Sequence, residues 1–357
     1  MWDCVWFCSR NKMQIFMKLY IIMKKFLFLS VLASLMVFTG CKKDVESVTV
    51  TPESATVIVG KTLQLKATVN PDKAPQDVSW SSSDVTIAEV SASGLVTAMN
   101  VGTCEITAFA GDKKAVCKLT VEPMKFTVNG VSFDMIKVDG GTFDMGGTPE
   151  QGSDANENEY PVHPVTLTTF YMGKTEVTQA LWVAVMGVNP SLSQSDKLPI
   201  ENVNWNDCQL FVTALNQLLS DQLGGRKFSL PTEAQWEFAA RGGLKSKGYK
   251  YAGSNTLNDV GWNSDNSGSR LHEVATKLPN ELGLCDMSGN VYEWCLDWRD
   301  TYSGAAQTDP KGPSSGIVKI SRGGSFSWTI KGCRTTSRGG NPPADCKADV
   351  GMRLVLQ

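Results

Sequence analysis

The chain has 357 residues, of which 42% are hydrophobic and 20% are charged, and its formal net charge is -2. This length allows two or three domains. The nearly balanced charge provides no attraction for a polyanion, so we expect no nucleic-acid partner.

The N-terminal segment has the pattern of an export signal. Lys24 and Lys25 precede an apolar run over residues 26–38, which is shorter than the roughly 20 residues of a membrane span. The run leads into Thr39-Gly40-Cys41, which resembles the lipobox of bacterial lipoproteins. The resemblance implies that Cys41 is lipidated and becomes the mature N-terminus; a plain cleaved signal is the alternative.

On this interpretation residues 1–40 are an upstream extension and a signal peptide, and residues 41–46 are a charged tether. We therefore expect an exported protein that is lipid-anchored in the bacterial outer membrane and faces the cell surface. In an exported protein the downstream cysteines meet an oxidising compartment, where disulfides persist. The candidate pairs are Cys104 with Cys117, Cys208 with Cys333, and Cys285 with Cys295, which leaves Cys346 over.

Residues 47–122 are rich in Val, Thr and Ser, and short alternating runs end at Gly, Pro, Asn or Asp. This pattern predicts a small antiparallel sandwich. The segment resembles the group 2 bacterial immunoglobulin-like domain, which implies that Trp80 fills the core, that Gly94 and Gly102 serve turns, and that the domain is a spacer. Cys104 and Cys117 flank the turn between two adjacent strands, so either a disulfide or two separate buried thiols fit.

Residues 124–357 contain three helical patterns separated by long loops. Thr178 caps a first helix that ends at Gly187, and Thr232 opens a third with a Thr-x-x-Gln capping box. The second pattern covers residues 205–224. Its expected buried face consists of Leu210, Phe211, Ala214, Leu215 and Leu218. So much irregular structure needs internal fastening by buried Trp, ions or disulfides.

Seven motifs occur in this second region. They are VDGGTFDMGG (138–147), YPVHPVTLTTFYMGKTEVTQALW (160–182), PIENVNWNDC (199–208), FSLPTEAQWEFAARGG (228–243), ELGLCDMSGNVYEWCLDW (281–298), SRGGSF (321–326) and VGMRLV (350–355). In this order they resemble the sulfatase-modifying factor family, typified by formylglycine-generating enzyme. The predicted fold class is an all-β immunoglobulin-like sandwich followed by an α+β, loop-rich C-type lectin-like domain.

The resemblance also implies a chemistry to test against these residues. Enzymes of that family oxidise a sulfatase cysteine with copper and oxygen through two cysteines, because soft Cu(I) needs paired sulfur ligands. Here Cys333 matches the second position, but the first is Trp328; an alignment on Arg334 and Arg338 puts Ile330 in the site instead. Either alignment removes the pair, so we expect no copper, and Cys333 is a weak candidate nucleophile.

Other chemistries find little support in the side chains available. Related iron enzymes use several histidines, whereas this chain has only His163, expected to be structural or at the surface, and His272, expected to be solvated. We expect the carboxylates of the motifs to cap helices or to pair with arginines. They are Asp134, Asp144, Glu176, Glu233, Glu237 and Asp297.

One ion site follows from the resemblance. In DMSGNVYEW, Asp286 and Glu293 match side-chain ligands, and Gly289 and Val291 match backbone ligands, of a structural calcium site in formylglycine-generating enzyme. Hard oxygen ligands in a tight loop suit Ca²⁺. The alternative is that the two carboxylates hydrogen-bond the amides of the loop.

The C-terminal segment keeps scaffold residues, but the residues between them are varied. The segment resembles that of the variable proteins of diversity-generating retroelements, which share the lectin fold and in which this segment is randomised at adenine-rich codons. Many residues here belong to the set that mutation of adenines in Asn codons can reach. Ordinary sequence drift is the alternative. We predict a ligand-binding face, with Phe326 and Trp328 either in contact with ligand or in the core. The face comprises Phe326, Ser327, Trp328, Thr329, Ile330, Lys331, Gly332, Ser337, Gly339, Gly340, Asn341, Asp345, Cys346, Lys347, Ala348 and Asp349.

Three functions compete on these grounds. The favoured one is a surface lipoprotein that binds a protein or glycan through this face without catalysis. The first alternative is a formylglycine-generating oxidoreductase that acts on a protein cysteine with Cys333 alone. The second is a structural lipoprotein of an envelope or gliding-motility assembly.

Overall fold

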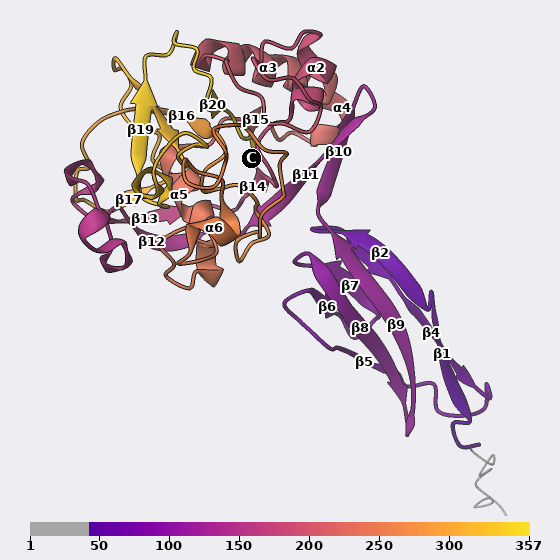
Figure 1. Ribbon diagram of the computed structural model, residues 1–357. Helices are drawn as coiled ribbons and strands as arrows, with labels where there is room; N and C mark the ends of the chain where they lie inside the picture. The colour runs from indigo at the N-terminus through magenta and orange to yellow at the C-terminus, as the bar shows by residue number, and fades with distance from the viewer. Residues whose placement is uncertain (1–42) are drawn as a thin grey trace, which may run out of the picture.

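The structure is a computed structural model that describes residues 43–357. The signal segment and Cys41 lie outside the described residues. Figure 1 shows a slender β-domain followed by a larger, loop-rich domain, with the C-terminus inside the second. Among the described residues, none of the helices combines the length and the apolar character that a membrane crossing requires.

The first domain is the predicted sandwich. A four-stranded sheet has the order β2-β9-β8-β5, a three-stranded sheet the order β3-β7-β6, and β1 pairs with β4. The strands are β1 (Ser47–Thr51), β2 (Ser54–Ile58), β3 (Thr62–Gln64), β4 (Lys66–Asn70), β5 (Ser79–Ser82), β6 (Ala88–Val90), β7 (Leu95–Ala98), β8 (Gly102–Ala110) and β9 (Lys113–Glu122). Period-2 alternation places Ile106 and Ala108 of β8 in the core.

Trp80 is half-buried against this core, and Gly94 lies against its ring: a Cβ at Gly94 would stand 2.8 Å from Trp80 Cζ2. The backbone at Gly94 is left-handed (φ +79), so glycine is required for both reasons. Cys104 stands opposite Leu119, and Cys117 opposite Ile106. The two cysteines are therefore diagonal neighbours rather than partners, and both are free buried thiols.

The two domains join through a single residue. Strand β9 ends at Glu122 and β10 begins at Met124, so only Pro123 separates them. Proline has a fixed φ and no amide donor, which ends the β9 ladder and stiffens the junction. Gly60 of the first domain lies close to Tyr171 of the second, since a Cβ at Gly60 would be 3.4 Å from the Tyr171 hydroxyl.

Three small sheets form the frame of the second domain. Their orders are β10-β11-β14-β21-β15, β12-β13-β17 and β19-β18-β16-β20. The strands are β10 (Met124–Val128), β11 (Val131–Val138), β12 (Gly141–Met145), β13 (His163–Leu167), β14 (Phe170–Gly173), β15 (Phe228–Ser229), β16 (Tyr292–Trp298), β17 (Gln307–Thr308), β18 (Lys319–Arg322), β19 (Arg338–Asn341), β20 (Val350–Gly351) and β21 (Val355–Leu356). Because β21 pairs with both β14 and β15, the last residues close the domain.

Short helices pack around these sheets. The α-helices are α2 (Gln179–Met186), α3 (Trp205–Leu218), α4 (Ser220–Leu223), α5 (Glu233–Ala240) and α6 (Leu257–Val260). The 3-10 turns are η1 (Pro149–Asp154), η2 (Glu157–Glu159), η3 (Gly243–Lys245) and η4 (Ile330–Cys333). The predicted start signals are confirmed: Thr178 accepts from the Leu181 amide, and Thr232 forms a capping box with Gln235.

The predicted buried face of α3 is wrong in part. Leu210 and Leu218 are 60% and 50% exposed, whereas Phe211 and Leu215 are fully buried together with Cys208. The actual stripe is Cys208, Phe211, Val212 and Leu215. The sequence pattern overestimated the width of the apolar face, because Leu is common on exposed helix surfaces.

The proposed disulfides of the second domain are not formed, because every described cysteine is free. Cys208 belongs to the core beneath α3, while Cys333 lies in a separate cluster with Tyr251, Leu257 and Val260. Cys285 and Cys295 are also separate buried thiols. The domain is instead fastened by fully buried ion pairs.

Arg353 contacts Glu293, Arg334 contacts Glu159, and Arg322 contacts Glu237. These pairs join segments that are far apart in sequence, and their arginine side chains are entirely buried. Paired and hydrogen-bonded charges can be buried without the cost of an isolated ion. The expectation that motif carboxylates pair with arginines or cap helices holds for Glu233, Glu237 and Asp297.

Candidate functional site

A hollow of about 500 Å³ lies over the C-terminal segment. It is built on the sheet β19-β18-β16-β20 and bordered by η4. The residues that line it are Asn156, Tyr292, Arg299, Ser321, Trp328, Thr329, Lys331, Gly332, Ser337, Arg338, Gly339, Gly340, Asn341, Lys347, Asp349 and Val350. We call this the ligand hollow.

The floor of the ligand hollow is formed by β19. Gly339 pairs with Ser321 and Gly340 with Ile320 across the sheet. A Cβ at Gly339 would stand 2.8 Å from Ser321 Oγ and 3.0 Å from Tyr292 Cε1. A side chain at this position would therefore push into the sheet, and the two glycines expose backbone to whatever enters.

The walls carry two aromatic rings. Trp328 is 50% exposed and meets Tyr292 edge to face, with ring centroids 5.6 Å apart. Burial raises the pKa of Tyr292, so its hydroxyl stays protonated at neutral pH. An exposed Trp held by a buried Tyr provides a rigid contact area of the kind that dominates binding interfaces.

Charged groups surround the rings. Lys331 reaches Asp154 at 3.1 Å and Lys347 reaches Asp345 at 3.7 Å, and all four side chains are at least partly exposed. Asp349 accepts hydrogen bonds from Ser325 Oγ at 2.8 Å and from Ser327 Oγ at 3.0 Å. These bonds tie the segment after the Gly-Gly-Ser turn to the far side of the hollow.

The structure brings ten of the sixteen predicted binding residues into the lining of the hollow. They are Trp328, Thr329, Lys331, Gly332, Ser337, Gly339, Gly340, Asn341, Lys347 and Asp349. Phe326, Ser327, Ile330, Asp345, Cys346 and Ala348 lie outside it, and Phe326 is half-buried.

Sequence reasoning did not predict the other six lining residues as binding residues, namely Asn156, Tyr292, Arg299, Ser321, Arg338 and Val350. Tyr292 could have been suspected, because an aromatic residue stands beside the Gly-Asn turn of a matched motif. Asn156 and Arg299 carry no local signal. They come from loops that only the tertiary fold brings to the rim.

Cys333 does not face the hollow. Its side chain is completely buried, and its Sγ lies 3.9 Å from the Ser325 carbonyl. Burial raises the pKa of Cys333 to about 12, so the thiol is protonated at neutral pH. Gly324 covers it closely, because a Cβ there would be 2.6 Å from Sγ. This geometry gives no support to Cys333 as a nucleophile.

In this structure the two carboxylates of the implied calcium site have hydrogen-bond partners from the protein. Both carboxylate oxygens of Glu293 accept from Arg353, and one also accepts from Trp236 Nε1 at 2.7 Å. Asp286 accepts from the Ala275 amide, and only its Oδ1 is buried without a partner. Among the residues described, no three His, Cys, Asp or Glu side chains stand close enough together to hold a metal. The calcium site stays a prediction, and no part of the function proposed below depends on it.

Each of the two histidines packs against an aromatic side chain. His163 is 2% exposed and packs against Tyr302, with ring centroids 4.7 Å apart. His272 was expected to be solvated, but it is half-buried and stacks on Trp262 at 3.7 Å. Its Nε2 also contacts the Ser267 carbonyl at 2.8 Å. Neither ring opens into the ligand hollow.

Comparisons with known proteins agree with this architecture. Residues 122–357 match the family model of the sulfatase-modifying factor enzyme 1-like domain, and residues 44–121 match that of the group 2 bacterial Ig-like domain. The chain is 30% identical over 270 residues to the chaperone protein LppX of Paenibacillus barcinonensis, covering 63% of this chain and 90% of that one. It is 32% identical over 202 residues to the formylglycine-generating enzyme of Thermomonospora curvata, covering 50% of this chain and 62% of that enzyme.

A solved structure is also similar. The Treponema denticola variable protein 1 is 34% identical and superposes with a TM-score of 0.58, covering 65% of this chain and 98% of that one. PvdO of Pseudomonas aeruginosa, at 23% identity and a TM-score of 0.55 over 66% of this chain and 99% of that one, supports the fold.

Proposed function

The chain belongs to the family of the sulfatase-modifying factor enzyme 1-like domain, carried behind a bacterial Ig-like domain, and we propose that it binds a protein or glycan ligand in the ligand hollow without catalysis. One observation carries this proposal. Ten of the sixteen residues that the sequence predicted for the binding face line an open hollow, while the cysteine that aligns with the family's chemistry is fully buried and does not line it.

The alternative suggested by the family is an oxidoreductase that acts on a protein cysteine. Paired thiolates would be needed to hold Cu(I). Here the residue at the other position of the pair is Trp328 or Ile330, according to the alignment, and Cys333 is a buried, protonated thiol. These facts favour binding over oxidation, with the scaffold retained and the reactive pair replaced.

The test compares binding with turnover in the same preparation of the full chain. We expect capture of protein or glycan ligands on arrays to fall at least tenfold in Trp328→Ala, because an exposed aromatic anchor is lost. Cys333→Ala should retain capture. A matched control is Leu244→Ala, which truncates an exposed apolar residue outside the hollow.

The same preparation is then incubated with copper, oxygen and a peptide that contains Cys-x-Pro-x-Arg, and the peptide is read by mass spectrometry. Conversion of the peptide cysteine that disappears in Cys333→Ala would overturn the binding proposal. No conversion, together with loss of capture in Trp328→Ala alone, would support it.

We further propose that the hollow is diversified. Thr329, Ser337 and Asn341 line it and belong to the set reachable by mutation of adenines in Asn codons. The similarity to a protein named as a variable protein supports this proposal. Sequencing the gene across isolates should find differences concentrated at hollow codons, and an even spread over the gene would contradict the proposal.

The location follows from the predicted lipobox. We propose that a lipid at Cys41 anchors the chain in the outer membrane and that the Ig-like domain, joined through Pro123 alone, holds the ligand hollow away from the surface. Metabolic labelling with a fatty-acid analogue should mark the wild type but not Cys41→Ser. Surface protease access in intact cells would then show which way the domain faces.

A further inference from the structure

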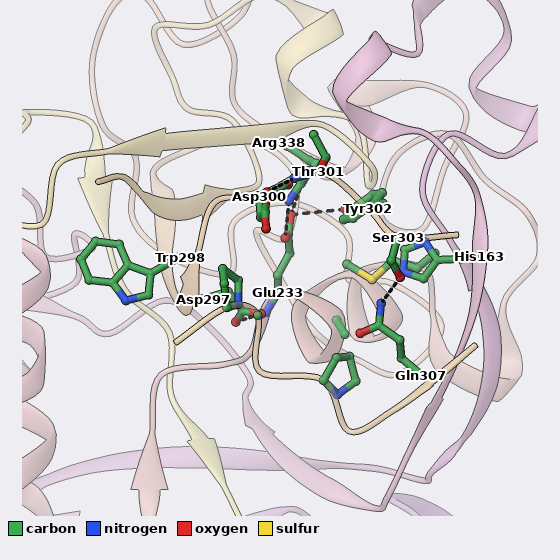
Figure 2. Close-up of a pocket in the computed structure, with 15 residues that line it drawn as sticks. His163, Glu233, Asp297, Trp298, Asp300, Thr301, Tyr302, Ser303, Gln307 and Arg338 are labelled. Carbon is green, nitrogen blue, oxygen red and sulfur yellow. Dashed lines mark hydrogen bonds and ion pairs between the residues drawn. The ribbon is translucent and has the colours of Figure 1, made fainter. Parts of the chain in front are cut away.

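A second cavity, of about 270 Å³, lies beside α5 and is separate from the ligand hollow except that Arg338 contributes to both. Figure 2 shows Asp297 and Glu233 on one side of it, and Tyr302, Ser303 and His163 on the other, with Gln307 below. Its walls come from β12, β13, α5, the end of β16 and the loop that follows. We call it the acidic cavity.

Asp297 is the residue that makes this cavity unusual. It is only 5% exposed. Its Oδ2 accepts from the Glu233 amide at 2.8 Å, which caps α5, while its Oδ1 accepts no hydrogen bond from another described residue. Gly312 closes over the carboxylate, since a Cβ there would stand 2.9 Å from Asp297 Cβ and 3.1 Å from Oδ1. Any larger residue at position 312 would therefore crowd this oxygen.

Glu233, another carboxylate of the wall, is already neutralised by an arginine. Both oxygens of Glu233 accept from Arg338, at 2.7 and 2.8 Å. Lys319 is the cation near Asp297, but its ammonium donates to the Leu296 carbonyl at 2.7 Å and lies between the rings of Trp205 and Trp298. Asp297 therefore has no ion-pair partner among the residues described.

Two further groups offer acceptor oxygens to the cavity. Gln307 Nε2 donates to Ser303 Oγ at 3.3 Å, which leaves the Gln307 carbonyl oxygen available. Asp300 adds a third carboxylate, on the exposed side, and has no ion pair in the described structure. Met145 and Ala234 supply apolar surface deeper in the wall. An acceptor-rich cavity with an uncompensated carboxylate and an apolar flank calls for a cationic donor with an aliphatic stem.

We propose that the acidic cavity binds a protonated alkyl amine, with its ammonium at Asp297 and its methylene stem along Met145 and Ala234. The amine is either a lysine side chain of a bound protein or a free aliphatic diamine. A metal ion is less suited, because no group of three His, Cys, Asp or Glu side chains in the described chain could hold one. The three donor hydrogens of an ammonium match Asp297 Oδ1 and the acceptors around it.

The experiment titrates the full chain with Nα-acetyl-lysine methylamide and with cadaverine, read by ligand-observed saturation-transfer NMR. Nα-acetyl-norleucine methylamide, which lacks the ammonium, is the matched ligand. We expect the lysine probe to bind and the norleucine probe to bind at least tenfold more weakly. If cadaverine binds more tightly than the lysine probe, the source is a free diamine; the reverse order indicates a protein lysine.

Two variants make the result specific to this cavity. Asp297→Asn keeps an oxygen for the Glu233 amide and so keeps the cap, but it removes the charge; we expect at least tenfold weaker binding of the amine. Ser303→Phe fills an exposed edge of the cavity and leaves every charge in place, and we expect the same loss. Asp265→Asn, an exposed carboxylate elsewhere, should bind like the wild type. Equal binding in Asp297→Asn and the wild type would overturn the proposal.

The pH dependence adds an independent readout. Burial, together with the charge of Glu233, raises the pKa of Asp297 to about 7. Since an alkyl ammonium stays protonated up to about pH 10, affinity should rise about tenfold from pH 6 to pH 8 as Asp297 ionises. The charged or titratable groups around it are Glu233 of α5, Lys319 of β18, Arg338 of β19, His163 of β13, and Asp300 and Tyr302 of the following loop.

In Asp297→Asn this rise should disappear. If it persists there, another of these groups controls the binding and the assignment to Asp297 is wrong. These measurements involve neither Trp328 nor the ligand hollow, so they succeed or fail independently of the proposed function.

Discussion

Replacing Arg353 with leucine is expected to destabilise the second domain by about 3 to 5 kcal/mol, because it leaves the buried carboxylate of Glu293 without a cationic partner. Arg353 is fully buried and binds Glu293 through Nε at 2.9 Å and through Nη2 at 2.6 Å. It also donates to the carbonyls of Gly173 and Cys285. One side chain thus ties together β14, β16 and the Gly-Asn loop.

The measurement is urea unfolding of the full chain followed by near-ultraviolet circular dichroism. Arg270→Leu, an exposed arginine, is the control and should change stability by less than about 0.5 kcal/mol. The double variant Glu293→Met with Arg353→Leu should be less damaged than the sum of its parts, since no lone charge remains. If Arg353→Leu is as stable as the wild type, the Arg353–Glu293 pair does not stabilise the domain.

Replacing Arg334 with leucine is expected to abolish ligand capture and to destabilise the domain by a similar amount, about 3 to 5 kcal/mol. Arg334 follows η4 directly and is fully buried. It donates to both oxygens of Glu159, at 2.9 and 2.5 Å, and to the Lys331 carbonyl at 3.0 Å. Without it the segment that carries Trp328 and Lys331 loses its anchor to η2.

This pair also predicts a dependence on pH. Burial raises the pKa of Glu159, but hydrogen bonds from Arg334 and Thr336 outweigh it and leave the pKa below its usual value. A lowered pKa means that the contribution to stability is fully present above the unfolded value, about 4.3, and is lost as pH falls through the folded value. The stability difference between wild type and Arg334→Leu should therefore shrink as pH falls, first because the unpaired Glu159 of the variant takes up a proton, and then below about pH 4 because the wild-type pair itself is lost.

Arg334→Lys is the matched control for the geometry of the pair. It keeps the charge but cannot make the two-pronged contact with Glu159, so we expect intermediate stability and reduced capture. Capture that survives in Arg334→Leu at full strength would mean that the hollow does not need this anchor.

Much of the fold followed from local patterns. The caps at Thr178 and Thr232 and the left-handed stop at Gly187 depend on hydrogen bonds within a few residues, which a single sequence displays directly. None of the three candidate disulfides is formed among the described residues, because cysteine spacing does not encode the distance between segments. His272 was misjudged for the same reason, since the Trp262 ring that covers it is invisible in its own polar stretch.

The sequence by itself determined the domain classes, the helix starts and the segment that carries the ligand hollow, because these depend on periodicity, capping and ordered motifs. Only the tertiary structure decided that Cys333 is sealed beneath Gly324, that Tyr292 and Arg299 reach the hollow, and that Asp297 faces a second cavity. Burial and charge pairing arise from contacts between segments distant in the chain. No short stretch of residues specifies such contacts, and they are settled only when the loops pack around the buried Arg–Glu pairs.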